Sequence, residues 1–284
     1  MRSIQPLRGA ALLALSALLF SLMGVFIREA SVTVSNEVIV FFRNLVGVLF
    51  FLPLVLAKGL QPLKTDRPLT HLKRTAYGLG AMYCFFYAIA HLPLADAMLF
   101  TYSAPVFTPL LAWLWLKEPL TRRMLALSLV GLAGVLLVSK PSGALFSSLS
   151  LVGLAASLLA ASAFVSIREM SDSEPAFRIV FYFAFFSTSL SAIPLAWAWQ
   201  PLDSQQLLLL LAAGLLAALA QFAMSQAYAL APPGLIGPVA YSAIVFSGII
   251  AWLLWNETPG PSSIAGAALI FTASILSVMQ KKPT

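Results

Sequence analysis

Four apolar stretches of this chain carry polar and aromatic side chains that could line a binding pocket. Two of them place such residues at positions i, i+3 and i+7, which share one face of a helix. These residues are Gly80, Tyr83 and Tyr87 in one stretch, and Gln221, Met224 and Tyr228 in the other. Two further stretches carry the pairs Tyr102-Ser103 and Tyr241-Ser242. Aromatic rings, hydroxyls and an amide would form an uncharged lining, which suits zwitterionic or aromatic solutes better than phosphates. The alternative is that these groups cement helix–helix packing.

Two arginines, Arg43 and Arg178, lie within or at the edge of apolar stretches. Each could bind a substrate carboxylate, or pair with a gate carboxylate such as Glu29 or Glu169. The alternative is a structural ion pair at a helix end, or a side chain that extends to the interface.

Several chemistries lack their residues. No metal-ligand motif, paired cysteine set or Gly-rich phosphate loop is present, so we expect no metal, no cofactor and no enzyme activity. No carboxylate lies in the middle of an apolar stretch, which favours a facilitator or substrate-driven carrier over an obligate proton antiporter. A carrier of organic cations would need such a carboxylate, and a sugar-phosphate carrier would need a central Lys or Arg. The sequence places neither.

The elements that position these residues are membrane helices. The chain is 60% hydrophobic and only 10% charged, too little charge to cover a globule of 284 residues in water. Runs of about 20 apolar residues can cross the bilayer, and only helices satisfy the backbone there. The expected spans are 7–28, 37–57, 72–91, 95–116, 122–139, 150–168, 176–199, 206–230, 235–255 and 262–280.

The distribution of basic residues predicts the orientation. Apart from Arg43 inside a span, only Arg28 and Lys140 fall in the segments on one side of the membrane. All other Lys and Arg, including Arg74, are assigned to the opposite side, which the positive-inside rule makes cytoplasmic. We therefore expect both termini in the cytoplasm, and we interpret the net charge of +7 as topology and not as nucleic-acid binding.

The sequence repeats itself with a period of about 140 residues. The matched segments are Ile27-Arg28-Glu29 with Ile167-Arg168-Glu169, Phe42-Arg43 with Phe177-Arg178, Tyr87-Ala88 with Tyr228-Ala229, and Tyr102 to Phe107 with Tyr241 to Phe246. Trp113 and Glu118 match Trp252 and Glu257. Because the period holds five spans, an odd number, the second half must enter the membrane from the opposite side. This predicts two inverted five-helix units, 1–145 and 146–284, around a central cavity, as in secondary transporters.

The segment from Pro105 through Lys117-Glu118-Pro119, followed by Gly131 to Val135, resembles the EamA-type repeat of the drug/metabolite transporter superfamily. A second copy runs through Trp252, Glu257 and Gly266. The resemblance implies a ten-helix carrier, and it is closest to the YddG-type amino-acid exporters. We therefore expect an inner-membrane exporter of amino acids, aromatic or neutral, that works by alternating access. Its partners would be a small-molecule substrate and lipid, without nucleic acid and without an obligate protein partner, since both halves lie in one chain. The alternatives are a broad exporter of drugs or organic cations, or a channel or structural membrane subunit.

Overall fold

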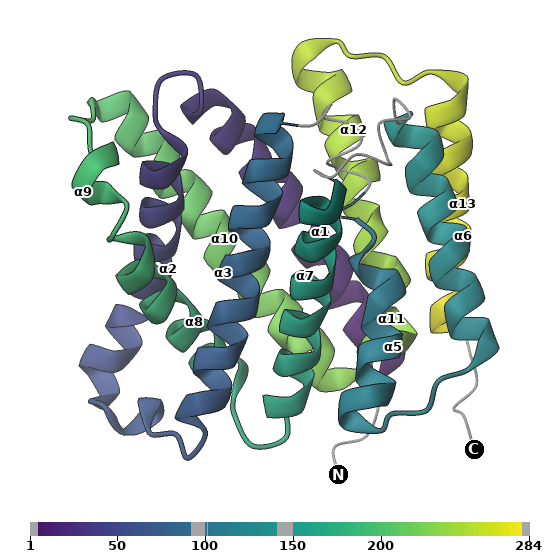
Figure 1. Cartoon of the computed structure of the whole chain (residues 1–284), viewed down its shortest axis with the longest axis horizontal. Coiled ribbons are helices and arrows are strands. Elements are labelled where there is room, and N and C mark those ends of the chain that lie inside the picture. The colour runs from purple at the N-terminus through teal and green to yellow at the C-terminus, as the bar shows by residue number, and fades with distance from the viewer. Residues whose placement is uncertain (1–4, 92–99, 101, 141–149, 280–284) are drawn as a thin grey trace.

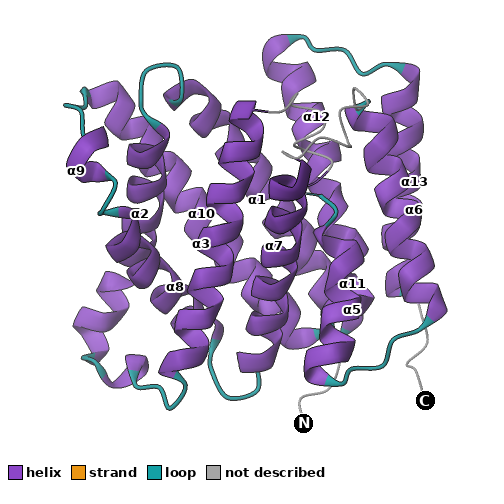
Figure 2. Cartoon of the chain, viewed as in Figure 1, coloured by secondary structure: helices purple, strands orange, loops and turns teal. Residues whose placement is uncertain are grey.

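The computed structural model describes residues 5–91, 100, 102–140 and 150–279. Within this part of the chain every regular element is a helix (Figure 2). The long helices are α1 (Pro6–Ala30), α2 (Asn36–Lys58), α3 (Pro68–His91), α5 (Ala104–Leu116), α6 (Arg122–Ser139), α7 (Ser150–Met170), α8 (Ala176–Ser191), α10 (Ser204–Leu230), α12 (Ser242–Trp255) and α13 (Pro261–Val278). The short ones are η1 (Gln61–Leu63), α9 (Leu195–Ala198), α11 (Pro233–Ile236) and η3 (Gly237–Tyr241).

Seven helical segments are long and apolar enough to cross a membrane. They are Pro6–Ala30, Asn36–Ala57, Arg122–Ser139, Leu151–Met170, Ser204–Leu230, Pro233–Trp255 and Pro261–Val278, and the shorter apolar helices are α5 and α8. The chain is therefore a multi-pass membrane protein. Of the expected span 95–116, residues 95–99 and 101 lie outside the described residues.

Prolines divide two of the expected spans. The span 176–199 was expected as one helix, but α8 ends at Ser191 and a separate turn, α9, begins after Pro194. The span 235–255 likewise starts as α11 and as η3, which contains Pro238, before α12 begins at Ser242. Proline has no N–H to donate and its ring clashes with the preceding turn, so a helix bends or ends there.

The helices pack in pairs that recur when the two halves of the chain are exchanged (Figure 1). Helix α1 runs along α10, and the equivalent α7 runs along α3. In the same way α5 packs on α7 while α12 packs on α1, and α2 packs on α10 while α8 packs on α3. Two further pairs, α2 with α8 and α6 with α13, join a helix to its own counterpart.

Both termini of the described chain lie at one end of the helix bundle. Helix α1 begins and α13 ends at the same end of the bundle, the lower end in Figure 1, where Pro6, Leu7 and Val278 line a common surface hollow. We call this end the terminal face and the opposite end the distal face. The α2–α3 connection and the α7–α8 turn also lie at the terminal face (Figure 1).

Helices α6 and α13 touch backbone to backbone at Gly134 and Gly266. A Cβ atom at Gly134 would lie 2.7 Å from the carbonyl oxygen of Gly266, and a Cβ at Gly266 would lie 2.5 Å from that of Gly134. No side chain other than hydrogen fits between two backbones this close, as in other membrane helix pairs joined by small residues. The seam joins the last long helix of one half to the last long helix of the other.

Candidate functional site

A small cavity lies between α2, α8 and α10. Arg43, Asn44 and Gly47 line it from α2, Phe183 and Ala184 from α8, and Gln221 from α10. Its volume is about 20 Å³. This is room for about one water molecule, so a metabolite could enter only if the helices moved apart. The lining is nevertheless polar where it meets α2 and α10.

Arg43 points from α2 toward α3. Its Nη1 lies 3.2 Å from the thioether sulfur of Met82, a weak acceptor that carries no charge. The side chain is partly buried, and it lines the cavity. Next to it, the Asn44 side chain is buried and donates from Nδ2 to the Val40 carbonyl at 2.9 Å.

Arg74 reaches the same region from α3, and it is only 2% exposed. Its Nη2 donates to Oε1 of Gln221 at 2.9 Å, and its guanidinium carbon lies 3.8 Å from the centre of the Phe183 ring. Gly78, one helical turn further on, makes the space, because a Cβ there would collide with Nη1 of Arg74. The Nε and Nη1 atoms of Arg74 are buried without a hydrogen-bond partner among the described residues.

No carboxylate balances these two arginines within the part of the chain that the structure describes. The ion pairs found there join Arg28 to Glu257, Arg67 to Glu169, Arg168 to Glu118 and Arg178 to Glu174. A buried charge without a partner is costly inside a membrane protein, and such residues mark substrate or ion pathways. Arg74 was assigned to a cytoplasmic segment and was not predicted at the pocket. In the structure it lies buried near the start of α3, beside Gln221.

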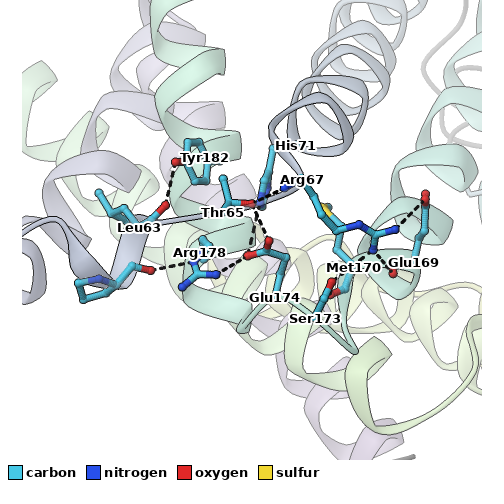
Figure 3. Close-up of polar contacts among 11 residues, drawn as sticks. Leu63, Thr65, Arg67, His71, Glu169, Met170, Ser173, Glu174, Arg178 and Tyr182 are labelled. Carbon is cyan, nitrogen blue, oxygen red and sulfur yellow. Dashed lines mark hydrogen bonds and ion pairs between the residues drawn. The ribbon is translucent and has the colours of Figure 1, made fainter.

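A second polar region, which we call the terminal clasp, joins the α2–α3 connection to the α7–α8 turn (Figure 3). Its centre is Glu174, which is 4% exposed and accepts hydrogen bonds from Thr65 at 2.5 Å and from Nη1 of Arg178 at 2.7 Å. Arg178 also donates from Nε to the Pro62 carbonyl at 2.7 Å. Tyr182, one turn along α8, donates to the Leu63 carbonyl at 2.9 Å. These bonds hold the connection against α8.

Arg67 extends the terminal clasp to the end of α7. Its Nη1 donates to the Glu169 carbonyl at 2.9 Å and to the Ser173 hydroxyl at 3.3 Å, and its Nη2 lies 3.6 Å from the Glu169 carboxylate. The guanidinium therefore bridges α3 and the α7–α8 turn (Figure 3).

His71 completes the terminal clasp as a neutral ring. It lies in the first turn of α3, ahead of the expected span 72–91, and packs against Tyr182 with 4.5 Å between ring centres. Burial lowers the pKa of His71 to about 4, although the Glu174 carboxylate opposes the shift. Its Nε2 lies 3.8 Å from Glu174, but an uncharged imidazole at that distance forms no ion pair at neutral pH.

The distal face has weaker counterparts of these contacts. Arg28 and Glu257 lie 3.2 Å apart with more than half of each side chain exposed, whereas Arg168 and Glu118 at the terminal face lie 2.7 Å apart and are mostly buried. At the distal α1–α2 turn, Thr33 accepts hydrogen bonds from the neutral side chains of Gln200 at 2.8 Å and Gln206 at 3.0 Å. Among the residues that the structure describes, the terminal face therefore holds the more buried ion pairs.

The predicted pocket residues lie in several environments. Gln221 lines the cavity, and the Tyr83 hydroxyl is buried without a partner among the described residues. Gly80 faces Leu159 of α7. Tyr87 is 48% exposed, whereas Met224 and Tyr228 belong to the packed core between α1, α7 and α10.

The two tyrosines predicted on the fourth and ninth spans pack against α6. Tyr241 is fully buried, and its hydroxyl donates to the Ser128 carbonyl at 2.9 Å. Tyr102 packs against the apolar cluster that Tyr241 forms with Val135 and Ile270, and Ser103 and Ser242 are buried. The role of these residues in substrate binding stays a prediction.

The predicted gate residues make different pairs from those expected. Arg178 bonds Glu174, and Glu169 pairs with Arg67. Glu29 is exposed and takes no part in the ion pairs of the described residues, and Arg43 contacts Met82. Arg74, Asn44 and Phe183 were not predicted as site residues. The signal for Arg74 was its place just inside the apolar run 72–91, four residues before a glycine.

Long apolar helices that enclose buried cations around a small cavity are typical of a membrane transport protein. The EamA-like transporter family matches residues 7–140 and again residues 147–279, so the chain belongs to this family and is a transporter. The chain is similar to the pseudopaline exporter CntI of Pseudomonas aeruginosa, with 36% identity over 279 residues, 96% of this chain and 97% of that protein. It is 25% identical over 244 residues to an S-adenosylmethionine uptake transporter of Rickettsia bellii, 86% of this chain and 84% of that protein. One protein of solved structure superposes with a TM-score of 0.81 over 94% of this chain and 96% of that chain, and its 20% identity shows the fold alone.

Proposed function

We propose that this transporter is a ten-helix secondary carrier that exports an amino acid or an amino-acid-like metabolite across the bacterial inner membrane. Its two inverted units, 1–145 and 146–284, move against each other so that the central cavity opens to either side in turn. The terminal face is cytoplasmic, in agreement with the basic residues that gather there. One chain supplies both halves, so a monomer is sufficient.

The observation that carries this proposal is the recurrence of helix contacts between the halves. The pairs α1–α10 and α7–α3 are equivalent, and so are the ion pairs Arg28–Glu257 and Arg168–Glu118, which join a helix end of one half to a loop of the other. The helices α5 and α12 even end alike, with Lys117 and Asn256 in the left-handed conformation just before the paired glutamates. Two similar halves around a central site support alternating access.

The substrate class and the direction rest on a relative and on the lining of the cavity. A relative with 36% identity is named as an exporter, and it covers nearly the whole chain. The Gln221 amide and the Asn44 side chain beside a guanidinium supply donors and acceptors for a small polar solute. An exporter of amino-acid-like metabolites fits both observations.

Counterflow in proteoliposomes tests this function. Vesicles that hold purified protein are preloaded with one unlabelled amino acid, and uptake of the labelled compound is followed. A carrier accumulates label transiently against its gradient because inward and outward steps are coupled, whereas a channel only equilibrates it. We expect saturable accumulation that Gln221→Ala reduces and that Leu253→Ala, a change at a side chain 70% exposed on the outer surface of α12, leaves unchanged. Equilibration without accumulation would contradict the carrier, and no uptake of any amino acid would contradict the substrate class.

A further inference from the structure

We propose that Arg43 and Arg74 together form a carboxylate-binding site, so that the preferred substrate carries more than one carboxylate. This inference rests on the proposed transport function and makes its substrate class more specific. The site would use the two guanidinium groups as its charged part and Gln221 with Asn44 as its neutral part.

Neither arginine has a negatively charged partner among the described residues. Arg43 contacts a thioether and Arg74 contacts an amide and an aromatic ring, and none of these three groups is negative. Two cations near each other in a medium of low dielectric constant repel, and each has lost most of its hydration. A carboxylate beside each guanidinium would relieve both costs. A single zwitterion brings one carboxylate and one ammonium, whereas a solute with two carboxylates matches both arginines.

The Arg74 guanidinium has N–H groups available to a carboxylate. Arg74 has Nε and Nη1 buried without partners among the described residues. These two atoms lie on different edges of the planar guanidinium, so each can donate one hydrogen bond to a carboxylate oxygen, and the second N–H of Nη2 can complete a parallel pair with either of them. The contact with Phe183 covers one face of the guanidinium, and Gln221 fixes the Nη2 corner. Arg74 is therefore held in place with its remaining donors free.

Small residues between α2 and α8 would let the cavity widen. The cavity wall beside Arg43 is built from small residues, with Gly47 on α2 and Ala184 on α8, and a Cβ at Gly47 would lie 3.1 Å from that of Ala184. Helices that meet through small side chains can separate without pulling interlocked side chains apart. Gly78 similarly leaves the Arg74 guanidinium its place beside Phe183. The same contact that closes the cavity in this conformation can open it for a solute.

The test is ligand-dependent thermal stability of the purified protein in detergent, which requires no transport. Glutamate and glutamine are the probes because they differ only in a carboxylate that is replaced by an amide. A ligand that binds the folded state raises its melting temperature. We expect millimolar glutamate to raise the melting temperature and glutamine to raise it less, and we expect Arg74→Gln and Arg43→Gln to abolish the difference. Arg123→Gln, which removes an exposed positive charge at the start of α6, is the matched control and should keep it.

A second readout separates a binding role from a structural one. An unpaired buried cation destabilises the free protein, so Arg74→Gln without ligand should melt at the same temperature as wild type or higher. A loss of melting temperature in Arg74→Gln would assign Arg74 to packing and overturn the proposal. Equal stabilisation by glutamate and glutamine would also overturn it, as would stabilisation by inorganic phosphate with none by glutamate.

Counterflow then distinguishes this inference from the proposed function. Amino-acid exchange that glutamate does not inhibit more strongly than glutamine would leave the carrier intact and overturn the carboxylate site. Glutamate-dependent stabilisation that the two arginine variants abolish, in a protein that exchanges no amino acid, would support the site and contradict the amino-acid assignment.

Discussion

Two arginines at equivalent places in the sequence repeat have opposite surroundings. Arg43 follows Phe42 on α2, and Arg178 follows Phe177 on α8. Arg178 has Glu174 four residues before it and donates to this carboxylate at 2.7 Å and to the Pro62 carbonyl at 2.7 Å. Arg43 has Ile39 at the corresponding place, and its contact is the sulfur of Met82 at 3.2 Å.

The difference separates two uses of a charged side chain in a membrane protein. A guanidinium whose charge and donors are matched by the chain itself stabilises one arrangement of helices, and Arg178 does so in the terminal clasp. A guanidinium that the chain leaves unmatched keeps its donors for another molecule. The position four residues earlier holds a carboxylate, Glu174, in one case and Ile39 in the other.

The largest effect is expected from breaking the terminal clasp with Glu174→Gln. This change leaves the mostly buried Arg178 without its anion, and loss of one partner of a buried pair costs about 3 kcal/mol of unfolding free energy. Thermal or denaturant unfolding in detergent measures this loss. Adding Arg178→Gln to the same protein should recover part of the loss, because it removes the unpaired charge. A loss as small as that of the exposed Glu257→Gln would show that the clasp does not stabilise the fold.

The comparison can also be reversed by giving Arg43 its own carboxylate. Ile39→Glu places an acid one helical turn before Arg43, as Glu174 stands before Arg178. A carboxylate bound to Arg43 would compete with the substrate, and the loss of one charge-assisted contact of about 2 kcal/mol corresponds to about thirtyfold weaker glutamate binding.

Isothermal titration of the detergent-purified protein with glutamate measures this change. Ile39→Gln is the matched control, because a glutamine side chain has the size of a glutamate side chain but carries no charge. This variant should bind glutamate nearly as well as the wild-type protein. Equal weakening by both variants would attribute the effect to packing around Ile39, which is 2% exposed.

The smallest effect is the difference between the two equivalent ion pairs. Glu118→Gln removes the anion from the mostly buried pair with Arg168 and should lower the unfolding free energy by about 1 kcal/mol. Glu257→Gln removes it from the exposed pair with Arg28, where solvent screening leaves at most a few tenths of that amount. Parallel melting curves compare the two. A larger loss in Glu257→Gln than in Glu118→Gln would contradict this ranking of the two ion pairs.

Much of the fold could be predicted because hydropathy reports directly on the bilayer. The helices α1, α2, α6, α7, α10 and α13 lie where apolar runs of sufficient length predict them. The interruptions near Pro194 and Pro238 could not be predicted with certainty, since Pro53 lies inside α2 without ending it. Whether a proline ends a helix or only bends it depends on what its neighbours supply to the freed carbonyls.

The site could be predicted only in part, because side-chain reach is not visible in a sequence. Gln221 was predicted to line a pocket, and in the structure it lines the small cavity between α2, α8 and α10. Arg74 stands near the end of an apolar run, where a basic residue usually extends to the interface, and its inward direction depends on the space beside Gly78 and on Gln221 from a helix far along the chain. The partner of Arg178 was expected among more distant carboxylates, whereas the chain supplies Glu174 one turn away.

The contact between Gly134 and Gly266 has a mechanical consequence. The side chain of Ile270 also lies over Gly134, and those of Leu137 and Val138 lie over Gly266, so the two helices are fitted to each other as closely as their backbones allow. Closely packed helices of this kind transmit strain and move together. Because α6 and α13 belong to different halves of the chain, this contact would hold the two halves together at a place away from the cavity between α2, α8 and α10.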